Sequence, residues 1–357
     1  MWKAMDWSAR LGMSVPIVQG PFGGGLSSVE LTATVSDSGG LGSFGAHHLS
    51  GEQLLATAAQ LRRCTARPFA LNLWIPHQGS DAAHIDDAQF ERQVQRLHPY
   101  YDALGLSPPQ RPRTFWPAYD EQLAAVLDAR PAVFSFVFGA PSHTVLEACR
   151  RRNIFTIGTA TSVREALHLE QAGVDAVVAS GFEAGGHRTS FLQEPECCLT
   201  GTLALIPQVV DAVKRPVIAA GGIADGRGVA AALALGAQGV QIGTAFLACR
   251  QSNASPVHRE ALFGDDAGHT ALTRAFTGRL ARGIVNRFMR EQAMHADDLP
   301  PYPIQNWFTA PIKAAAAAQG RPEFLPLWAG QAAPLLRSRD AGGFMQGLIA
   351  DLDRRLG

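Results

Sequence analysis

Short apolar runs recur along the chain, and each one ends in glycine or polar residues. Eight of them stand out, at residues 15–19, 41–44, 69–74, 133–138, 155–158, 176–179, 217–220 and 240–243. Their length and their content of valine, isoleucine and phenylalanine are typical of strands that are buried on both faces. Stretches with helical spacing lie between most of them, such as 162–172 and 226–235, and a glycine follows several of these. The alternation predicts parallel strands with right-handed crossovers, and eight units predict an α/β fold of the TIM (β/α)8 barrel type.

Two segments are longer than a minimal barrel needs. One, at about residues 76–119, contains the aromatic cluster Tyr100, Tyr101, Phe115 and Trp116, and the other, at about residues 250–310, follows the last apolar run. Insertions of this length at the catalytic end of a barrel usually act as lids or binding loops. We therefore expect a single decorated barrel over residues 1–357, with a lid or small second domain. The alternative is that the two insertions only pack on the surface of the barrel and do not act as a lid.

The composition favours small-molecule chemistry. The chain has 357 residues, 46% of them hydrophobic, which suffices for one large core, and its formal net charge is zero. No basic stretch is interleaved with aromatic residues, so we expect neither a nucleic acid nor an anionic membrane as a partner. The first residues lack an apolar signal segment, and no apolar run has the length of a membrane span, so we expect a cytoplasmic protein. A homo-oligomer is compatible with these features.

The cysteines do not indicate a metal site. The five cysteines form no CxxC pair and show no zinc-type spacing, so we predict reduced thiols and no bound metal. Cys197 and Cys198 are adjacent, and adjacent cysteines form a disulfide only with strain, so ordinary packing is the expectation for both.

Residues 181–188 carry the most informative pattern in the chain. The segment reads GFEAGGHR and directly follows the sixth apolar run, so it places His187 behind two glycines at the carboxyl end of a predicted strand. Glycines let the backbone turn tightly and approach a ligand, and an imidazole has an unperturbed pKa near neutrality. The pattern indicates a ligand-binding floor that carries an acid or a base. The alternative is a loop histidine without chemistry.

The last two apolar runs end in turns that suit a phosphate group. Gly221 and Gly222 end one run, Gly243 and Thr244 end the next, and a predicted helix lies between them. In barrels, phosphates commonly bind between these two loops, where backbone N–H groups converge. Glycine lets the amides reach phosphate oxygens, and Thr244 adds a hydroxyl donor. The pair of turns predicts a phosphate-bearing ligand without choosing among sugar phosphates, nucleotides and flavin mononucleotide.

A resemblance to a known family reduces the number of candidate phosphate ligands. The chain resembles the nitronate monooxygenase (2-nitropropane dioxygenase-like) family of FMN-dependent barrels over nearly its whole length. The resemblance rests on residues 16–21, 38–43, 70–73, 135–139, 181–188, 219–228, 241–246, 276–279, 282–284 and 327–331. At Ser180 many relatives place a longer polar side chain, which puts any inference about substrate size in doubt.

The resemblance implies FMN as the cofactor and assigns residues to it. The phosphate would lie on Gly222, Gln241, Gly243 and Thr244, within turns that include Gly221 and Ile242. Asn72, Ser180 and Gly185 would lie near the ribityl chain and ring, and Gly20, Pro21 and Phe22 beside the isoalloxazine. His187 would face the flavin as the catalytic residue.

The implied reaction is the oxidative denitrification of an alkyl nitronate, such as propionate 3-nitronate, with molecular oxygen. Its products are a carbonyl compound and nitrite. His187 suits two roles: when neutral it can remove the α-proton of a nitroalkane, and when protonated it can hold the nitro oxygens by charge. The sequence leaves both roles open, and it leaves open whether nitroalkanes are also substrates.

Several other polar residues have less specific signals. His47, His48 and His143 could border the cavity, but we expect them to be solvated loop residues. Glu183 could act as an acid or a base, but we expect it to hydrogen-bond to the glycine turn. Two interpretations remain for Arg188, Arg279 and Arg282. They could attract an anionic substrate, or they could be ordinary surface charges.

Three competing functions remain at this point. An FMN-dependent enoyl reductase, which uses a reduced pyridine nucleotide, has a similar EAGGH segment, although residues 158–161 and 200–205 are closer to nitronate monooxygenases. A flavin-free phosphosugar isomerase or lyase could use the same phosphate turns, but no lysine follows a predicted strand to form a Schiff base. The third alternative is a barrel that only binds a nucleotide.

Overall fold

Eight parallel strands form a closed barrel in the computed structural model, which describes residues 2–3, 5–76, 85–112, 115 and 117–357. The strands are β1 (Ile17–Gln19), β2 (Gly42–Gly45), β3 (Phe69–Trp74), β4 (Val133–Val137), β5 (Phe155–Ala160), β6 (Ala176–Ser180), β8 (Val217–Ala220) and β9 (Gly239–Ile242). Their order is β1-β9-β8-β6-β5-β4-β3-β2. A parallel bridge between Val18 and Leu41 joins the two ends of this order. All eight predicted strands are present, and the TIM-barrel prediction is confirmed.

Helices cover the outside of the barrel. They are α2 (Val29–Asp37), α3 (Gly51–Cys64), α5 (Tyr119–Ala129), α6 (His143–Arg151), α7 (Val163–Ala172), α8 (Thr202–Ala212), α9 (Gly226–Ala234) and α14 (Ala341–Leu356). The helices predicted at 162–172 and 226–235 are α7 and α9. Ser162 caps α7 by accepting a hydrogen bond from the Glu165 amide, and Asp225 caps α9 in the same way. The last helix, α14, contacts α2 and α9 and completes the ring.

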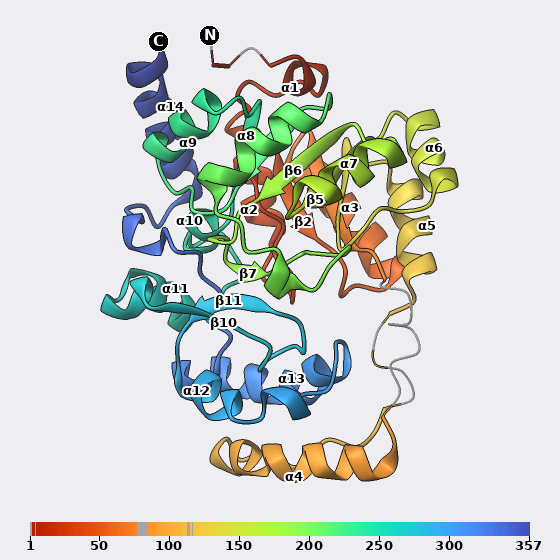
Figure 1. Cartoon of the computed structure of the whole chain (residues 1–357), viewed down its shortest axis with the longest axis vertical. Helices are drawn as coiled ribbons and strands as arrows, with labels where there is room; N and C mark the ends of the chain where they lie inside the picture. Colours follow the sequence, from red (N-terminus) through yellow and green to blue (C-terminus); the bar gives the residue numbers. More distant parts are fainter. Residues whose placement is uncertain (1, 4, 77–84, 113–114, 116) are drawn as a thin grey trace.

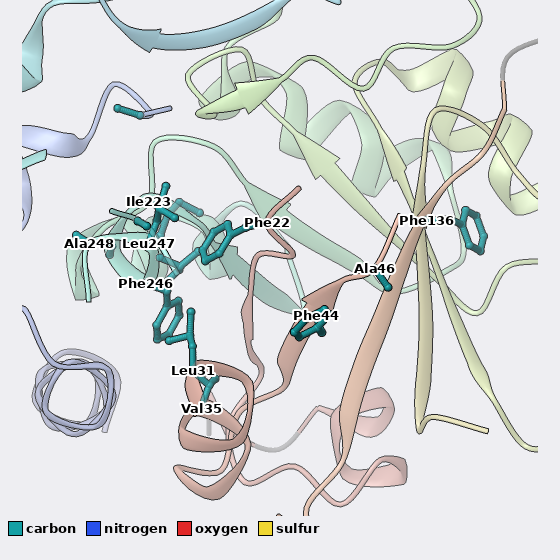
Figure 2. Packing of buried hydrophobic residues seen from close by; sticks show 14 of the residues in the cluster. Phe22, Leu31, Val35, Phe44, Ala46, Phe136, Ile223, Phe246, Leu247 and Ala248 are labelled. Atoms are coloured by element: carbon teal, nitrogen blue, oxygen red, sulfur yellow. The ribbon is translucent and has the colours of Figure 1, made fainter. Parts of the chain in front are cut away.

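Alternate strand residues pack in two different apolar clusters. Val178 and Ile218 belong to a cluster inside the barrel, together with Trp7 of α1 (Asp6–Arg10), whereas Val177 and Val217 pack outward among the helices. This division follows from the two-residue period of a strand. The outer cluster also reaches the short helix α10 (Thr244–Leu247) after β9; Figure 2 shows Phe246 near the α2 side chains and Phe22 close to Leu247.

A second layer lies on the end of the barrel where the strands finish, away from both chain termini (Figure 1). It contains a three-stranded sheet of β7 (Gly186–His187), β11 (Ala281–Ile284) and β10 (Thr270–Thr273), in which β11 pairs antiparallel with both others. Its helices are α4 (Asp87–Ala103), α11 (Pro256–Phe263), α12 (Arg287–Ala293) and α13 (Ile304–Ala318). The second insertion, which follows β9, thus extends past residue 310, and the chain rejoins the barrel in α14. Among the described residues, no helix combines the length and hydropathy of a membrane span.

The two insertions of the sequence meet inside this layer. Helix α4 comes from the first insertion and packs against α13 from the second (Figure 1). Arg96 of α4 donates hydrogen bonds to the side-chain oxygens of Gln292 and Gln305, and the Tyr101 hydroxyl donates to the Phe308 carbonyl at 2.8 Å. Trp116 and residues 77–84 lie outside the described residues. A role as a lid stays a prediction.

We predict that Arg96→Met loosens α4 while the barrel stays folded. The change removes a largely buried guanidinium and leaves the Gln292 and Gln305 oxygens without their donor, at a cost of about 2 kcal/mol. Hydrogen exchange should become faster in α4 but not in the barrel strands. Arg92→Met is the matched control, since Arg92 is exposed on the same helix. Equal protection of α4 in both variants would contradict the prediction.

Candidate functional site

A cavity of about 590 Å³ lies between the ends of the barrel strands and the second layer. Of the residues predicted from the sequence, the ones that line it are Gly20, Pro21, Phe22, Asn72, Ser180, Gly185, His187, Gly221, Gly222, Gln241, Gly243 and Thr244. Ile242 does not line it. Because neighbouring strand residues face opposite sides, Gln241 reaches the cavity whereas the Ile242 side chain is fully buried in the outer cluster.

The turns after β8 and β9 leave backbone donors available. The N–H groups of Gly222, Gly243 and Thr244 make no hydrogen bond to another described residue. Gly222 has φ +69°, which favours glycine. At Gly243 an added Cβ would meet only Phe22 Cε1, at 4.0 Å, so protein packing does not demand a glycine there. Because Gly243 has no side chain, the space beside the N–H groups of Gly222, Gly243 and Thr244 stays open to the cavity. This space is called the cradle below.

The loop after β1 is fixed by one hydroxyl group. Ser27 Oγ accepts hydrogen bonds from the amides of Phe22 and Gly45, both at 3.0 Å, and donates to the Phe22 carbonyl at 3.1 Å. The end of β1 is therefore tied to the end of β2. The Thr244 hydroxyl accepts from the Gly330 amide at 2.9 Å, and its own proton stays free for a ligand.

His187 lies on β7, where its pairing with Ala281 of β11 sets the direction of the side chain. The imidazole contacts two aromatic rings, with centroid distances of 4.9 Å to Trp74 and 5.5 Å to Trp328. Its Nε2 lies 2.9 Å from Thr277 Oγ1. Since the Thr277 hydroxyl has the Arg279 carbonyl as an acceptor at 3.2 Å, a neutral His187 can donate from Nε2 and keep Nδ1 as an acceptor.

The imidazole of His187 is held neutral by its surroundings. Burial lowers the pKa of His187 to about 3, and the positive charges of Arg279 and Lys313 act in the same direction. The neutral form therefore dominates throughout the physiological pH range. This state favours hydrogen bonding over attraction by charge.

The expectation for His47 was wrong. Its side chain is not solvated but 2% exposed, and its ring stacks on Trp74 at a centroid distance of 3.9 Å and an interplanar angle of 3°. Burial places the pKa of His47 well below its usual value, with further lowering by His48, His187 and Arg279. His48 also borders the cavity. His143 is exposed on α6, as expected.

Arg188 and Arg282 are not the ordinary surface charges that one interpretation of the sequence expected. Arg188 is 1% exposed and donates to the carbonyls of Gly181, Ser180 and Cys198. Arg282 is also buried and donates to the Phe182 carbonyl at 3.1 Å. Both guanidinium groups donate to carbonyls of the glycine loop after β6 or of its neighbours, and Arg282 donates in addition to the Thr270 hydroxyl at 3.2 Å.

Glu183 has the structural role that the sequence suggested. Its carboxylate accepts hydrogen bonds from the amide and the hydroxyl of Thr202, at 2.9 and 2.8 Å, at the start of α8. The partner is thus the start of α8 and not the glycine turn itself, and Glu183 does not line the cavity.

Arg279 lies behind the aromatic wall of the cavity. Its guanidinium lies 3.9 Å from the ring centroid of Phe138 and 4.6 Å from that of Tyr302. Burial lowers its pKa to about 10, and Nη1 makes no hydrogen bond to a described residue. Arg279 is therefore a buried cation held by aromatic faces and not a surface charge.

Lys313 is the residue that the sequence analysis missed. It lines the cavity from α13, and its ammonium donates to Asn306 Oδ1 at 2.7 Å. Burial lowers its pKa to about 7. Among the described residues that line the cavity there is no aspartate or glutamate, and no group of metal ligands was found in that part of the chain. The described lining thus combines amide donors, a neutral imidazole and the Lys313 side chain, with Arg279 behind the wall, and this arrangement suits anions.

Comparisons with known proteins agree with this geometry. A model of the nitronate monooxygenase family matches residues 8–352. A probable nitronate monooxygenase from Staphylococcus aureus (strain Newman) is 41% identical over 355 residues, which cover 99% of each chain. The structure of nitroalkane oxidase from Streptomyces ansochromogenes superposes with a TM-score of 0.88 at 37% identity, over 97% of this chain and 98% of that one.

A more distant structure shares the same architecture. FabK from Thermotoga maritima superposes with a TM-score of 0.76 at 26% identity, over 99% of this chain and 97% of that one. The full-length match to the family model, together with the 41% identity, decides the assignment: the chain belongs to the nitronate monooxygenase family and is an oxidoreductase.

Proposed function

We propose that this protein catalyses the FMN-dependent oxidative denitrification of alkyl nitronates with molecular oxygen, giving a carbonyl compound and nitrite. The observation that carries the proposal is a cavity in which amide donors and His187 converge and whose described lining contains no aspartate or glutamate. Family membership and the likeness to a nitroalkane oxidase support the same reaction class.

The residues present fit FMN. The cradle at Gly243 stays open although packing does not require it, and the N–H groups of Gly222, Gly243 and Thr244 are available for phosphate oxygens. Gln241 would also contact the phosphate, and Asn72, Ser180 and Gly185 would lie near the ribityl chain and ring, with the backbone of residues 20–22 beside the isoalloxazine. When bound, FMN supplies the capacity to take electrons from the substrate and to pass them to oxygen.

His187 would position the reacting end of the substrate. Its hydrogen bond with Thr277 fixes the ring, and in the tautomer that carries the proton on Nδ1, with Nε2 accepting from the Thr277 hydroxyl, Nδ1–H would donate to a nitronate oxygen. A base with so low a pKa removes protons poorly at neutral pH. We therefore propose that the substrate arrives already ionised, as the nitronate and not as the nitroalkane.

The proposal is tested by aerobic turnover of a nitronate by the FMN-loaded protein. Nitrite and the matching carbonyl compound should form in equal amounts, faster from the nitronate than from the freshly dissolved nitroalkane. Flavin reduction by NADPH with turnover of an enoyl thioester, and no nitrite, would instead assign an enoyl reductase. Colourless protein that takes up no FMN would favour one of the flavin-free alternatives.

We predict that His187→Ala lowers kcat/KM for a nitronate by on the order of 100-fold or more, because the variant loses the group that orients the reacting end. The flavin content should stay unchanged, since the phosphate turns are intact. His143→Ala serves as the control because His143 is exposed on α6. A His187→Ala variant with wild-type kcat/KM would remove this residue from the proposal.

We also predict that Gly243→Ala weakens FMN binding by about 10-fold or more without unfolding the barrel. The new methyl group clears all protein atoms by 4.0 Å yet enters the cradle where the phosphate would lie. Equilibrium titration of the apoprotein with FMN gives the dissociation constant. Gly347→Ala is the matched control, because a Cβ there also meets no protein atom within 4 Å but lies on α14. Equal FMN affinity in the two variants would place the phosphate elsewhere.

A further inference from the structure

The hydroxyl group of Thr277 lies between His187 and the backbone of Arg279. Thr277 Oγ1 is 2.9 Å from Nε2 of His187, 3.2 Å from the Arg279 carbonyl oxygen and 3.3 Å from the Arg279 amide nitrogen. Thr277 is 5% exposed and lines the cavity. The amide can only donate and the carbonyl can only accept, whereas a ring nitrogen of histidine can do either. The hydroxyl therefore has one partner whose role is not fixed.

The turn that carries Thr277 is tightly constrained. The Gly278 amide donates to the Arg274 carbonyl at 2.8 Å, and Gly278 has φ +79°, which favours glycine. A Cβ at Gly278 would also overlap the Pro300 carbonyl oxygen. Aromatic rings hold the side chain of Arg279 on the other side of the turn. The backbone around Thr277 thus has little freedom, and the main movement left to the hydroxyl is rotation of its proton.

A threonine hydroxyl has one proton and two acceptor lone pairs. If the proton of Thr277 points to the Arg279 carbonyl, Oγ1 accepts from the Arg279 amide and from Nε2–H of His187, and Nδ1 is an acceptor. If the proton points to Nε2, the neutral imidazole carries its own proton on Nδ1, which becomes a donor. Between the two arrangements one proton leaves Nε2 for water and one from water binds Nδ1, so the charge of the ring is unchanged. Rotation of one O–H bond therefore accompanies a change of tautomer.

The ligand decides which arrangement is more stable. The first arrangement has one more hydrogen bond within the protein, because the Arg279 carbonyl keeps its donor. An oxyanion in the cavity would accept from Nδ1–H, and a hydrogen bond to a charged acceptor is roughly twice as strong as a neutral one. Burial lowers the pKa of His187 to about 3, so at neutral pH the ring carries a single proton and not one on each nitrogen. An anion therefore favours the second arrangement.

We propose that Thr277 is a positioning residue that selects the tautomer of His187. Its hydroxyl accepts from Nε2 in the ligand-free protein and donates to Nε2 when an oxyanion binds at Nδ1. This inference rests on the proposed function and deepens it, because a nitronate oxygen is the oxyanion that the reaction would bring to Nδ1. A neutral histidine can then give the substrate a hydrogen-bond donor without becoming charged.

Nitrogen NMR spectroscopy of the FMN-loaded protein with isotope-labelled histidine tests the tautomer directly. Protonated and unprotonated ring nitrogens have different chemical shifts, and the signals of His187 are identified by their loss in His187→Ala. Without a ligand, Nε2 should carry the proton. With saturating nitrite, which presents two oxygens on nitrogen as a nitronate does, the proton should be on Nδ1. The same tautomer in both samples would overturn the proposal.

Two variants connect the tautomer to the hydroxyl. Thr277→Val keeps the shape of the side chain but leaves a buried Nε2 lone pair without a donor, so the change of tautomer should need about 10-fold more nitrite. The kcat/KM for propionate 3-nitronate should fall by about the same factor. Thr277→Ser retains the hydroxyl and should keep both values within about 3-fold of the wild type.

Thr273→Val is the matched control. The Thr273 hydroxyl accepts from the Ala275 amide in the same segment, and Thr273 does not line the cavity, so this variant should match the wild type. If Thr277→Val also matches the wild type, the hydroxyl does not act on His187. If Thr277→Ser loses as much as Thr277→Val, Thr277 only packs at this place. Either result would overturn the proposal.

The NMR measurement separates this inference from the proposed reaction, because it needs no turnover. If the wild type releases no nitrite from a nitronate, the proposed function fails, whereas a nitrite-dependent tautomer of His187 would still support the role of Thr277. If nitrite is released normally but the tautomer does not change, only the inference about Thr277 fails.

Discussion

The absence of a carboxylate from the described cavity lining is the constraint on which the chemistry of the site depends. Lys313 and Arg279 lie near His187, and no aspartate or glutamate lines the cavity among the described residues, so this part of the chain offers their charges no carboxylate partner there. In a poorly solvated space, such charges repel a further proton and attract anions. Burial lowers the pKa of His187 most, and these charges add to it, so the imidazole stays neutral. The same charges suit the phosphate-bearing cofactor and the anionic substrate that we propose.

The rest of the structure keeps these groups in place. The barrel brings the ends of eight strands to one side, and the second layer covers that side with the sheet that carries His187 (Figure 1). Arg188 and Arg282 hold the glycine loop through its carbonyls, and Glu183 fastens it to the start of α8. The charged side chains Glu183 and Arg188 of this loop are engaged by other parts of the protein, so His187 is the titratable group of the loop that faces the cavity.

The sequence predicted the parts of this design that depend on local pattern. The eight strands follow from short apolar runs, and the turns at Gly222 and Gly243 follow from glycines placed at strand ends. His187 was found because its glycines precede it directly. Ile242 was assigned to the cofactor with its neighbours, although the alternation along β9 turns its side chain outward.

The features that the sequence did not predict depend on contacts between distant segments. His47 is buried because Trp74 of another strand stacks on it, and Arg279 is enclosed by rings from three separate segments. In the sequence, Lys313 is one polar residue in an alanine-rich helix. Only the position of α13 over the barrel brings its side chain to the cavity. Its rarity in a chain rich in arginine is the one signal that could have identified it.

The most direct test of the account is anaerobic mixing of the FMN-loaded protein with propionate 3-nitronate while the flavin absorbance is followed. The account predicts that the oxidised-flavin absorbance falls within the time of one turnover, and that it returns with release of nitrite when oxygen is admitted. An unchanged spectrum, together with rapid bleaching by NADPH, would contradict it.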